Sequence, residues 1–337
     1  MQHQIFWEIH NAGLINQLMS VEIGSSISFL EKVDINFFNV KHKDYDGIYI
    51  PWSNTVRVKE FKKKYKPNIF EIINMPKDIN FKIVEDFFND NYEKHENIVS
   101  KYYKCNDGDY ENNFSEGRKK IVLNKNKSNV FKKNCFSFYS RFFYNRTKDL
   151  DIFLNKIKFK DQYVDLAKKI SLSFKNFCSI HFRLTDHAHN YKSNQEERMS
   201  FIKKIESFEK KIILSTDDKD LLSKEFGNKY LFVDDIILND FKNDFLNLDF
   251  HDDVILGLIS LLVLSHSDYF IGTPGSTFSS YIHRLRFLNN KENCFLFMNS
   301  RFNENFIQDG PFSWNGFKCD TLTKNWWREW PECKLMI

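Results

Sequence analysis

The chain has 337 residues, of which 42% are hydrophobic and 17% aromatic. This composition excludes an intrinsically disordered chain, and at about 100–200 residues per domain the length predicts two domains, each able to bury its own core. The net charge of +4 is mild, so basic runs such as residues 59–66 are interpreted as solvated faces rather than as binding sites for nucleic acid or an anionic membrane.

The N-terminal half begins with a pattern of strand, loop and helix. In chain order we expect a strand over 5–9, a loop over 10–16, a helix over 17–32, a strand over 35–40, a helix over 84–105, a loop or insertion over 106–129 and a helix over 149–169. Ile83 stands at core-like spacing with the apolar residues of the predicted helix over 84–105.

Strands and helices alternate regularly in the second half. The expected strands are 177–182, 211–215, 230–233, 269–272 and 293–297, and the expected helices are 195–210, 218–226, 251–265 and 277–287. Alternation at this spacing predicts an α/β fold with a parallel, doubly wound sheet.

The segment from Cys178 to Asp186 ends an apolar run with His181 and Arg183 and then a Thr-Asp turn. Because side chains alternate along a strand, His181 and Arg183 should point to the same side. In an open α/β sheet, ligands bind outside the carboxyl ends of the strands, which is where Arg183 should lie. A guanidinium there is a candidate phosphate receptor, although an Arg–Asp ion pair that closes the turn explains this segment equally well.

A second segment, residues 267–286, predicts a strand, a loop with Gly272, Pro274 and Gly275, and a helix that opens near Ser276 or Thr277. Small residues let the backbone approach a ligand closely, and the free amides of a helix start bind anions. An ordinary strand-to-helix turn with a Ser cap is the alternative. Together the two segments suggest a site for a nucleoside diphosphate.

The combination resembles the GDP-fucose-dependent fucosyltransferases, the superfamily that includes protein O-fucosyltransferases and α1,6-fucosyltransferases. The likeness is carried by His-x-Arg-x-Thr-Asp at 181–186, by Asp-x-Phe-Ile-Gly-Thr followed by Ser-Thr-Phe-Ser-Ser and Arg within 268–286, by Asn11 to Leu18, which is similar to a Gly-x-x-Asn-Gln loop, and by Ile212 to Asp218. It covers roughly residues 5–30 and 175–290.

The resemblance implies a GT-B-like fold, in which two Rossmann-like, doubly wound domains face a cleft. Residues 1–165 would form an N-terminal Rossmann-like domain with an insertion, on the acceptor side. Residues 166–300 would form the C-terminal domain that binds the GDP-sugar. Residues 301–337, an aromatic tail, would pack back on the N-terminal domain.

The resemblance also assigns roles to individual residues. By this resemblance, Arg183 replaces a metal ion in stabilising the leaving diphosphate, and His181 contacts the donor or orients Arg183. Asp186 fixes the loop or the fucose, and Asn16 lies near the sugar and phosphates. The phosphates and nucleoside are met by Ser276, Thr277 and Phe278, and Asp217 is an acid near the nucleotide. Two Asp-x-Asp tripeptides that could hold a metal, at 44–46 and 107–109, follow no clear strand and are interpreted as loop acids.

Two departures from the family pattern leave roles open. Ser260 stands where the family commonly has an Asp that accepts hydrogen bonds from guanine, and Asp252 or Asp253 could take over that function. Where the α1,6-type enzymes have a Lys and a Glu after the Thr-Asp pair, this chain has His187 and Tyr191. The general base therefore remains open among Asp186, His187, His189 and His10.

We therefore expect an inverting, metal-independent fucosyltransferase that moves L-fucose from GDP-β-L-fucose to a hydroxyl of a glycan or protein, with no cofactor beyond the donor. The alternatives are a transferase for another GDP-sugar, a deoxyhexose or heptose, and a nucleotide-sugar-binding pseudoenzyme. The six cysteines form no CxxC pair, and neither a signal peptide nor a transmembrane segment is visible, so we expect a cytoplasmic location.

Overall fold

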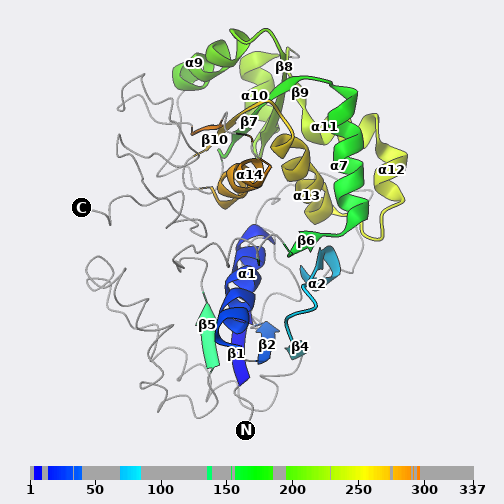
Figure 1. Ribbon diagram of the computed structural model, residues 1–337. Helices are drawn as coiled ribbons and strands as arrows, with labels where there is room; N and C mark the ends of the chain where they lie inside the picture. Colours follow the sequence, from blue (N-terminus) through cyan, green and yellow to red (C-terminus); the bar gives the residue numbers. More distant parts are fainter. Residues whose placement is uncertain are drawn as a thin grey trace, which may run out of the picture.

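The computed structural model describes residues 4–9, 14–32, 34–39, 69–84, 135–138, 153, 156–184, 195–227, 229–273, 276–289, 291 and 294–296. Within these ranges the chain forms a mixed α/β structure with two parallel sheets, one from each half of the sequence (Figure 1). No helix among the described residues is both long and apolar enough to span a membrane.

The N-terminal sheet has the strand order β4-β2-β1-β5, and all its described pairings are parallel. Its strands are β1 (Gln4–Ile9), β2 (Asp34–Asn39), β4 (Phe81–Val84) and β5 (Cys135–Phe138). Helix α1 (Leu14–Glu31) connects β1 to β2. The predicted strand, helix and strand are therefore present, but the helix begins earlier than expected, so Asn16 lies in its first turn and not in a loop.

Two expectations for this half were wrong. Ile83 belongs to strand β4, where it is 41% exposed, and not to a helix core. The helix expected over 149–169 is not continuous: Phe153 is helical, but Lys158 and Phe159 form strand β6, which pairs with β3 (Ile73–Asn74), and α7 begins at Asp161. The physical reason is a period of two, since Ile157 and Phe159 are buried and the residue between them is exposed. The insertion over 106–129 lies outside the described residues, as does most of the helix expected over 84–105.

The C-terminal sheet has the order β11-β10-β7-β8-β9, again with parallel pairings. Its strands are β7 (Phe177–Phe182), β8 (Lys211–Thr216), β9 (Leu231–Phe232), β10 (Tyr269–Gly272) and β11 (Cys294–Leu296). The helices that the structure describes, besides α1, are α2 (Ile69–Ile72), α7 (Asp161–Ser173), α9 (Gln195–Glu206), α10 (Lys219–Phe226), α11 (Val233–Asn239), α12 (Lys242–Leu246), α13 (Asp253–Ser265) and α14 (Thr277–Leu288). The predicted alternation is confirmed, whereas α11 and α12 were not expected.

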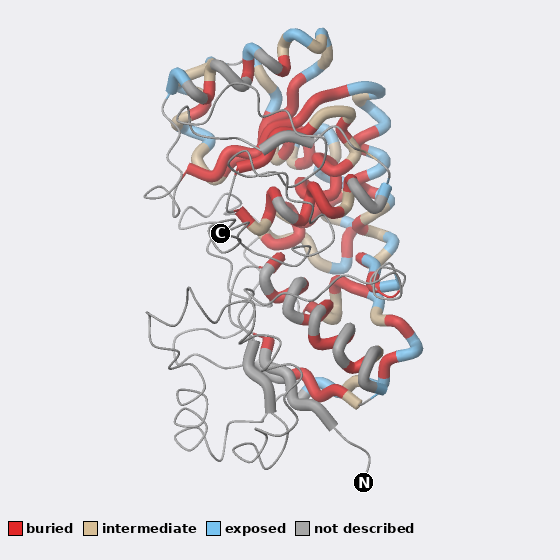
Figure 2. Tube along the Cα trace, turned by 60° about the vertical axis from the view of Figure 1, so that its left-hand side comes forward, coloured by how far each residue is buried: buried red, intermediate tan, exposed pale blue. Residues whose placement is uncertain are grey.

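Apolar side chains cover both faces of the C-terminal sheet. Phe177 and Ile213 pack on one side with α13 and α14, whereas Cys178, Ile180 and Leu214 pack on the other with α9 and α10. This division follows from the alternation of side chains along a strand and confirms a doubly wound sheet. Strand β7 is buried along its whole length, as is most of α13 (Figure 2).

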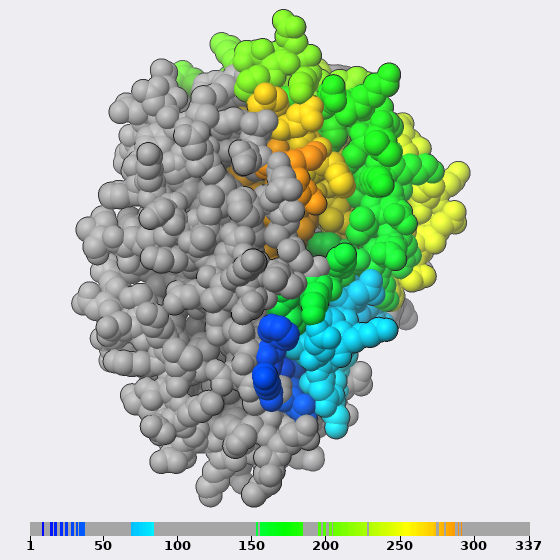
Figure 3. All heavy atoms as spheres, in the orientation of Figure 1, coloured from blue at the N-terminus to red at the C-terminus, as the bar shows by residue number. Residues whose placement is uncertain are grey.

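Described residues of the two halves of the chain contact each other in several places. The antiparallel pair of β3 and β6 places residues 69–84 beside the start of α7, and the two segments adjoin on the molecular surface (Figure 3). Helix α1 packs against α14 (Figure 1), and Glu22 of α1 forms a buried ion pair with Arg284. The N-terminal helix therefore lies next to the helix that follows β10.

Candidate functional site

The order of the C-terminal strands creates a point where the chain direction across the sheet reverses. Strand β7 lies in the middle, with β8 on one side and β10 on the other, so the connections after β7 and β10 leave toward opposite faces. Ligands of doubly wound sheets bind in the crevice at such a point, outside the carboxyl ends of the strands. Arg183, Asp217 and Thr273 follow β7, β8 and β10 there.

Arg183 is held in place by the next strand end. Its Nε lies 3.2 Å from Oδ2 of Asp217, and both side chains are less than 10% exposed. The other carboxylate oxygen of Asp217 accepts a hydrogen bond of 2.6 Å from the amide of Leu184. One carboxylate therefore orients the guanidinium and fixes the backbone that follows it.

Thr273 joins the two sequence segments that were singled out above. Its Oγ1 accepts a hydrogen bond of 3.0 Å from the amide of Arg183 and donates one of 2.7 Å to the carbonyl of His181. Its amide donates to Oγ of Ser279 at 2.9 Å, and that hydroxyl lies 2.7 Å from Nδ1 of His181. The carboxyl end of β7 and the start of α14 are thus locked together, as the phosphate-site hypothesis requires.

Gly272 makes this close approach possible. A Cβ atom there would lie 2.8 Å from Cβ of Ser279 and 3.1 Å from Nε2 of His283, which is closer than real side chains come. Phe278 is 1% exposed, and its ring centroid lies 4.6 Å from that of His181. The structure therefore places Phe278 in the core behind His181. Ser276 is buried, and its amide donates to the carbonyl of Thr273 at 3.4 Å.

A pocket that is partly open to solvent lies at these strand ends. Its lining contains five of the residues named from the sequence, namely His181, Arg183, Asp217, Asp253 and Ser260. The other lining residues are Ser215, Thr216, Asp234, Leu256 and Gly257. Ser276, Thr277 and Phe278 do not line it. His181 and Arg183 share the pocket, as expected from their spacing on one strand.

Asp234 was missed by the sequence analysis. It is the second residue after β9, lines the pocket, and accepts a hydrogen bond of 2.7 Å from the hydroxyl of Ser260. The rule that placed Arg183 at a strand end could have found it. Asp252 and Asp253 have different roles: Asp252 caps α13 by accepting hydrogen bonds from two amides, whereas Asp253 faces the pocket.

Three predicted site residues are not described fully enough to place. Asp186 and His187 lie outside the described residues, as does the candidate base His189. Asn16 lies in the first turn of α1, but the conformation of its side chain is not described. Among the described residues, no cluster of three or more His, Cys, Asp or Glu side chains has the arrangement of a metal site.

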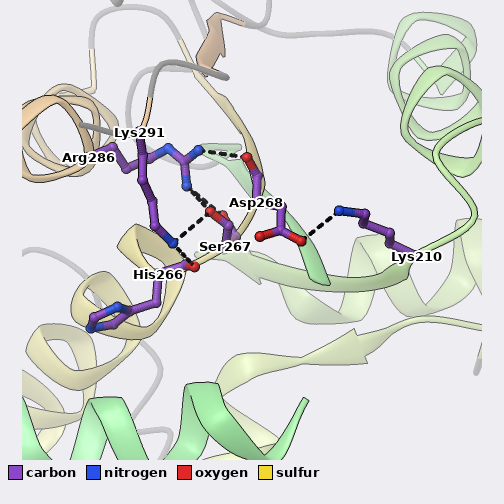
Figure 4. A network of polar contacts seen from close by, with 6 residues as sticks. All are labelled: Lys210, His266, Ser267, Asp268, Arg286 and Lys291. Atoms are coloured by element: carbon purple, nitrogen blue, oxygen red, sulfur yellow. Dashed lines mark hydrogen bonds and ion pairs between the residues drawn. The ribbon is translucent and has the colours of Figure 1, made fainter. Parts of the chain in front are cut away.

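The last arginine of the second motif has a structural role. Arg286 is fully buried and donates to the backbone carbonyls of Ser267 and Asp268, the latter at 2.9 Å (Figure 4). Lys291 also binds the carbonyl of Ser267, and Lys210 pairs with the carboxylate of Asp268 at 2.6 Å. Both carbonyls precede β10, so this network lies at the end of the strand opposite to the pocket.

Burial also disqualifies Cys178 as a nucleophile. Cys178 lies on β7 and faces α9 and α10, and burial raises the pKa of its thiol to about 11. A thiol with that pKa remains protonated at neutral pH.

No protein-family model matches the sequence, and no curated protein matches it either. Among solved structures, the chain is similar to the fucosyltransferase NodZ from Bradyrhizobium, with 13% identity, 84% of this chain and 92% of that chain covered, and a TM-score of 0.49. It is also similar to POFUT1 in complex with GDP, with 16% identity, 88% and 99% coverage, and a TM-score of 0.42. A structure of NodZ α1,6-fucosyltransferase soaked with GDP-fucose matches at 14% identity and a TM-score of 0.49.

Proposed function

We propose that the chain is a GDP-fucose-dependent glycosyltransferase of the GT-B type, which transfers L-fucose with inversion to a hydroxyl of a glycan or protein. The C-terminal domain, residues 166–300, holds the donor in this proposal. The N-terminal domain, residues 1–165, forms the acceptor side, and residues 301–337 pack back on it.

The position of Arg183 is the observation that carries the proposal. It is a buried guanidinium that lines a pocket at the carboxyl end of β7, next to the loop that opens α14. A guanidinium has five N–H donors in a planar fork, so a carboxylate can hold one side while phosphate oxygens bind another. Asp217 provides such a hold through Nε.

The chemistry follows from the charge that develops when the glycosidic bond to the diphosphate breaks. Negative charge grows on the β-phosphate while the sugar gains positive character, so a fixed cation beside the phosphate lowers the barrier. We infer that Arg183 supplies this charge and that the reaction needs no metal. The start of α14, with Ser276 and Thr277, adds the positive end of a helix dipole and backbone amides.

The acceptor hydroxyl must lose a proton as the new bond forms. Asp186 and His187 follow Arg183 closely in sequence, so either side chain is a candidate general base beside the donor. His181 is bonded to Ser279 and acts, in this proposal, as a positioning residue for the phosphate site. Asn16, in the first turn of α1, would approach from the acceptor side.

Transfer of another GDP-linked sugar, a deoxyhexose or heptose, is the second candidate. It is retained because the position of Arg183, which carries the proposal, would suit any sugar linked to a diphosphate and does not select the sugar. A pseudoenzyme would keep the pocket without turning the donor over.

Donor hydrolysis measured with a panel of GDP-, UDP- and CMP-sugars tests the proposal. GDP-fucose should be hydrolysed fastest, the rate should persist in EDTA, and Arg183→Ala should abolish it. Arg198→Ala is a matched control, because Arg198 is another buried arginine whose Nε binds a carboxylate, that of Glu225, away from the pocket. Loss of turnover in EDTA with an active Arg183→Ala variant would refute the assignment.

A further inference from the structure

The pocket has two chemically different parts. Arg183 and His181 line the part next to β7, where an anion is stabilised. Asp234 and Asp253 also line the pocket, whereas the carboxylate beside Nε of Arg183 is that of Asp217. A diphosphate is repelled by carboxylates, so the acidic part of the pocket must face a portion of the ligand that donates hydrogen bonds.

One face of helix α13 lines this part of the pocket. Asp253, Leu256, Gly257 and Ser260 line the pocket at a spacing of i, i+3, i+4 and i+7, which places them on one face of the helix. A glycine in a helix interior costs about 1 kcal/mol relative to alanine. Gly257 stands at the middle of this face and has no side chain to fill the pocket, so a planar ring can lie against the helix there.

Ser260 fixes the orientation of Asp234. Ser260 is 1% exposed, and its hydroxyl donates a hydrogen bond of 2.7 Å to Oδ1 of Asp234. The two residues lie on different helices, α13 and α11. Each oxygen of a carboxylate can accept about two hydrogen bonds, so this contact is compatible with further donors from a ligand. A serine that anchors the carboxylate from α13 keeps it directed along the face that carries Gly257.

We propose that Asp234 selects the nucleobase of the donor and that it selects guanine. The inference rests on the proposed function, because it needs a nucleoside diphosphate whose phosphates are bound near Arg183. Guanine presents two adjacent donors, N1–H and the 2-amino group, which match the two oxygens of a carboxylate. Uracil, cytosine and adenine each place an acceptor at that edge, and a carboxylate repels it.

The test exploits a change of chemistry rather than a simple loss. In Asp234→Asn the amide keeps one acceptor but replaces the other with a donor. It should therefore bind guanine poorly and favour xanthine, whose C2 carbonyl is an acceptor. Binding of GDP, IDP, XDP, UDP and inorganic pyrophosphate is measured by calorimetry for the wild type and for each variant.

The expected results separate the base from the phosphates. The wild type should bind GDP more tightly than IDP, which lacks the 2-amino group. Asp234→Asn should weaken the binding of GDP about 10- to 100-fold, the range for a hydrogen bond to a charged group, and strengthen the binding of XDP about tenfold. Pyrophosphate binding should change less than about twofold, within the error of such a comparison. A gain for XDP cannot come from a misfolded protein.

Two further variants complete the design. Asp235→Asn is the matched control, because Asp235 is the next residue on α11 and pairs with Lys219 at 40% side-chain exposure. It should leave all five affinities unchanged. Ser260→Ala keeps the carboxylate but removes its anchor, so it should weaken GDP less than Asp234→Asn does.

The inference and the proposed function fail in different ways. The role of Asp234 is overturned if the Asp234→Asn variant binds GDP as tightly as the wild type. It is also overturned if Asp253→Asn, and not Asp234→Asn, changes the preference from GDP to XDP. Both results leave the function intact if GDP binding still depends on Arg183. A wild type that binds UDP in preference to GDP would refute the proposed function itself.

Discussion

Two buried arginine–carboxylate pairs show how differently the same chemistry is used in this molecule. Arg183 and Asp217 have side-chain exposures of 8% and 3%, and Arg284 and Glu22 have 3% and 1%. The first pair lines a pocket at the carboxyl ends of β7 and β8. The second lies between α1 and α14, where the hydroxyl of Tyr281 donates to Glu22 at 2.9 Å.

The difference lies in what surrounds the pairs and not in their burial. Tyr281 is enclosed so completely that burial and the Glu22 carboxylate raise the pKa of its hydroxyl well above the usual value, and the arginine lies over its ring. That pair joins two halves of the chain. The pocket pair is open on one side to a ligand, so we assign binding to it and assembly to the other.

The largest effect should follow from breaking the assembly pair. Arg284→Ala leaves the Glu22 carboxylate buried without its cation, which typically costs about 3–5 kcal/mol. Urea unfolding should show this loss in the free energy of unfolding. Because a buried pair can often be replaced by apolar groups of similar volume, adding Glu22→Leu to Arg284→Met should recover part of it. If Arg284→Ala were as stable as the wild type, the assembly role assigned to the Arg284–Glu22 pair would be contradicted.

A substitution in the Arg183–Asp217 pair should instead lower the rate of catalysis. Arg183→Lys keeps the charge but loses the planar fork, so we expect about 2–4 kcal/mol of lost transition-state stabilisation, as for other lost donors to a developing anion. Steady-state hydrolysis of GDP-fucose measures this as a fall in kcat. Arg198→Lys, which alters the arginine paired with Glu225, should leave kcat unchanged. Equal losses in the two variants would mean that Arg183 acts only through the fold.

A smaller effect is expected where β10 meets α14. Gly272→Ala places a Cβ atom 2.8 Å from Cβ of Ser279, a contact that only a shift of helix or strand can relieve. Overpacking of this kind costs about 1–3 kcal/mol. Thermal unfolding should show a lower Tm, and the Michaelis constant for the donor should rise because Thr273 and Ser279 move with the helix. An unchanged Tm would show that the two elements can separate at no cost.

The sequence predicted the C-terminal half well because local and long-range signals agree there. The alternation of apolar strands with amphipathic helices located β7, β8, β10 and the helices after them, and the period of two placed His181 and Arg183 in one pocket. Asp217 was assigned through the family resemblance alone, and the structure places it directly after β8, in the lining of the pocket.

The failures occurred where partners distant in sequence decide the structure. Phe159 is in a strand because it pairs with Ile73, and no local pattern shows that partner. Strand β9 has only two residues, so Asp234 after it did not stand out as a strand-end residue. Thr273 was part of a recognised motif, but its contact with Arg183 depends on the neighbouring positions of β7 and β10.

The smallest predicted effect concerns the residue that connects the two regions. His283 lies one turn after Ser279 and directly before Arg284 on α14, is fully buried, and packs against the ring of Phe270 at 5.0 Å. Burial, and secondarily the charge of Arg286, lower its pKa from 6.5 to about 3. The unfolded chain therefore binds a proton that the native protein does not bind between these values. Stability is fully present above pH 6.5 and falls below it, by about 1.4 kcal/mol per pH unit.

Denaturant unfolding of the wild type and of His283→Gln from pH 4 to pH 9 isolates the contribution of His283 to the pH dependence of stability. The difference between the two free energies of unfolding should be constant from pH 7 to pH 9, where the imidazole is neutral in both states. Below pH 6.5 the wild type should lose stability more steeply than the variant. Parallel curves throughout would mean that His283 is protonated as easily in the fold as in the unfolded chain. The packing of α14 against β10, on which both the pocket and the helix pair depend, would then be looser than the contacts of Gly272 indicate.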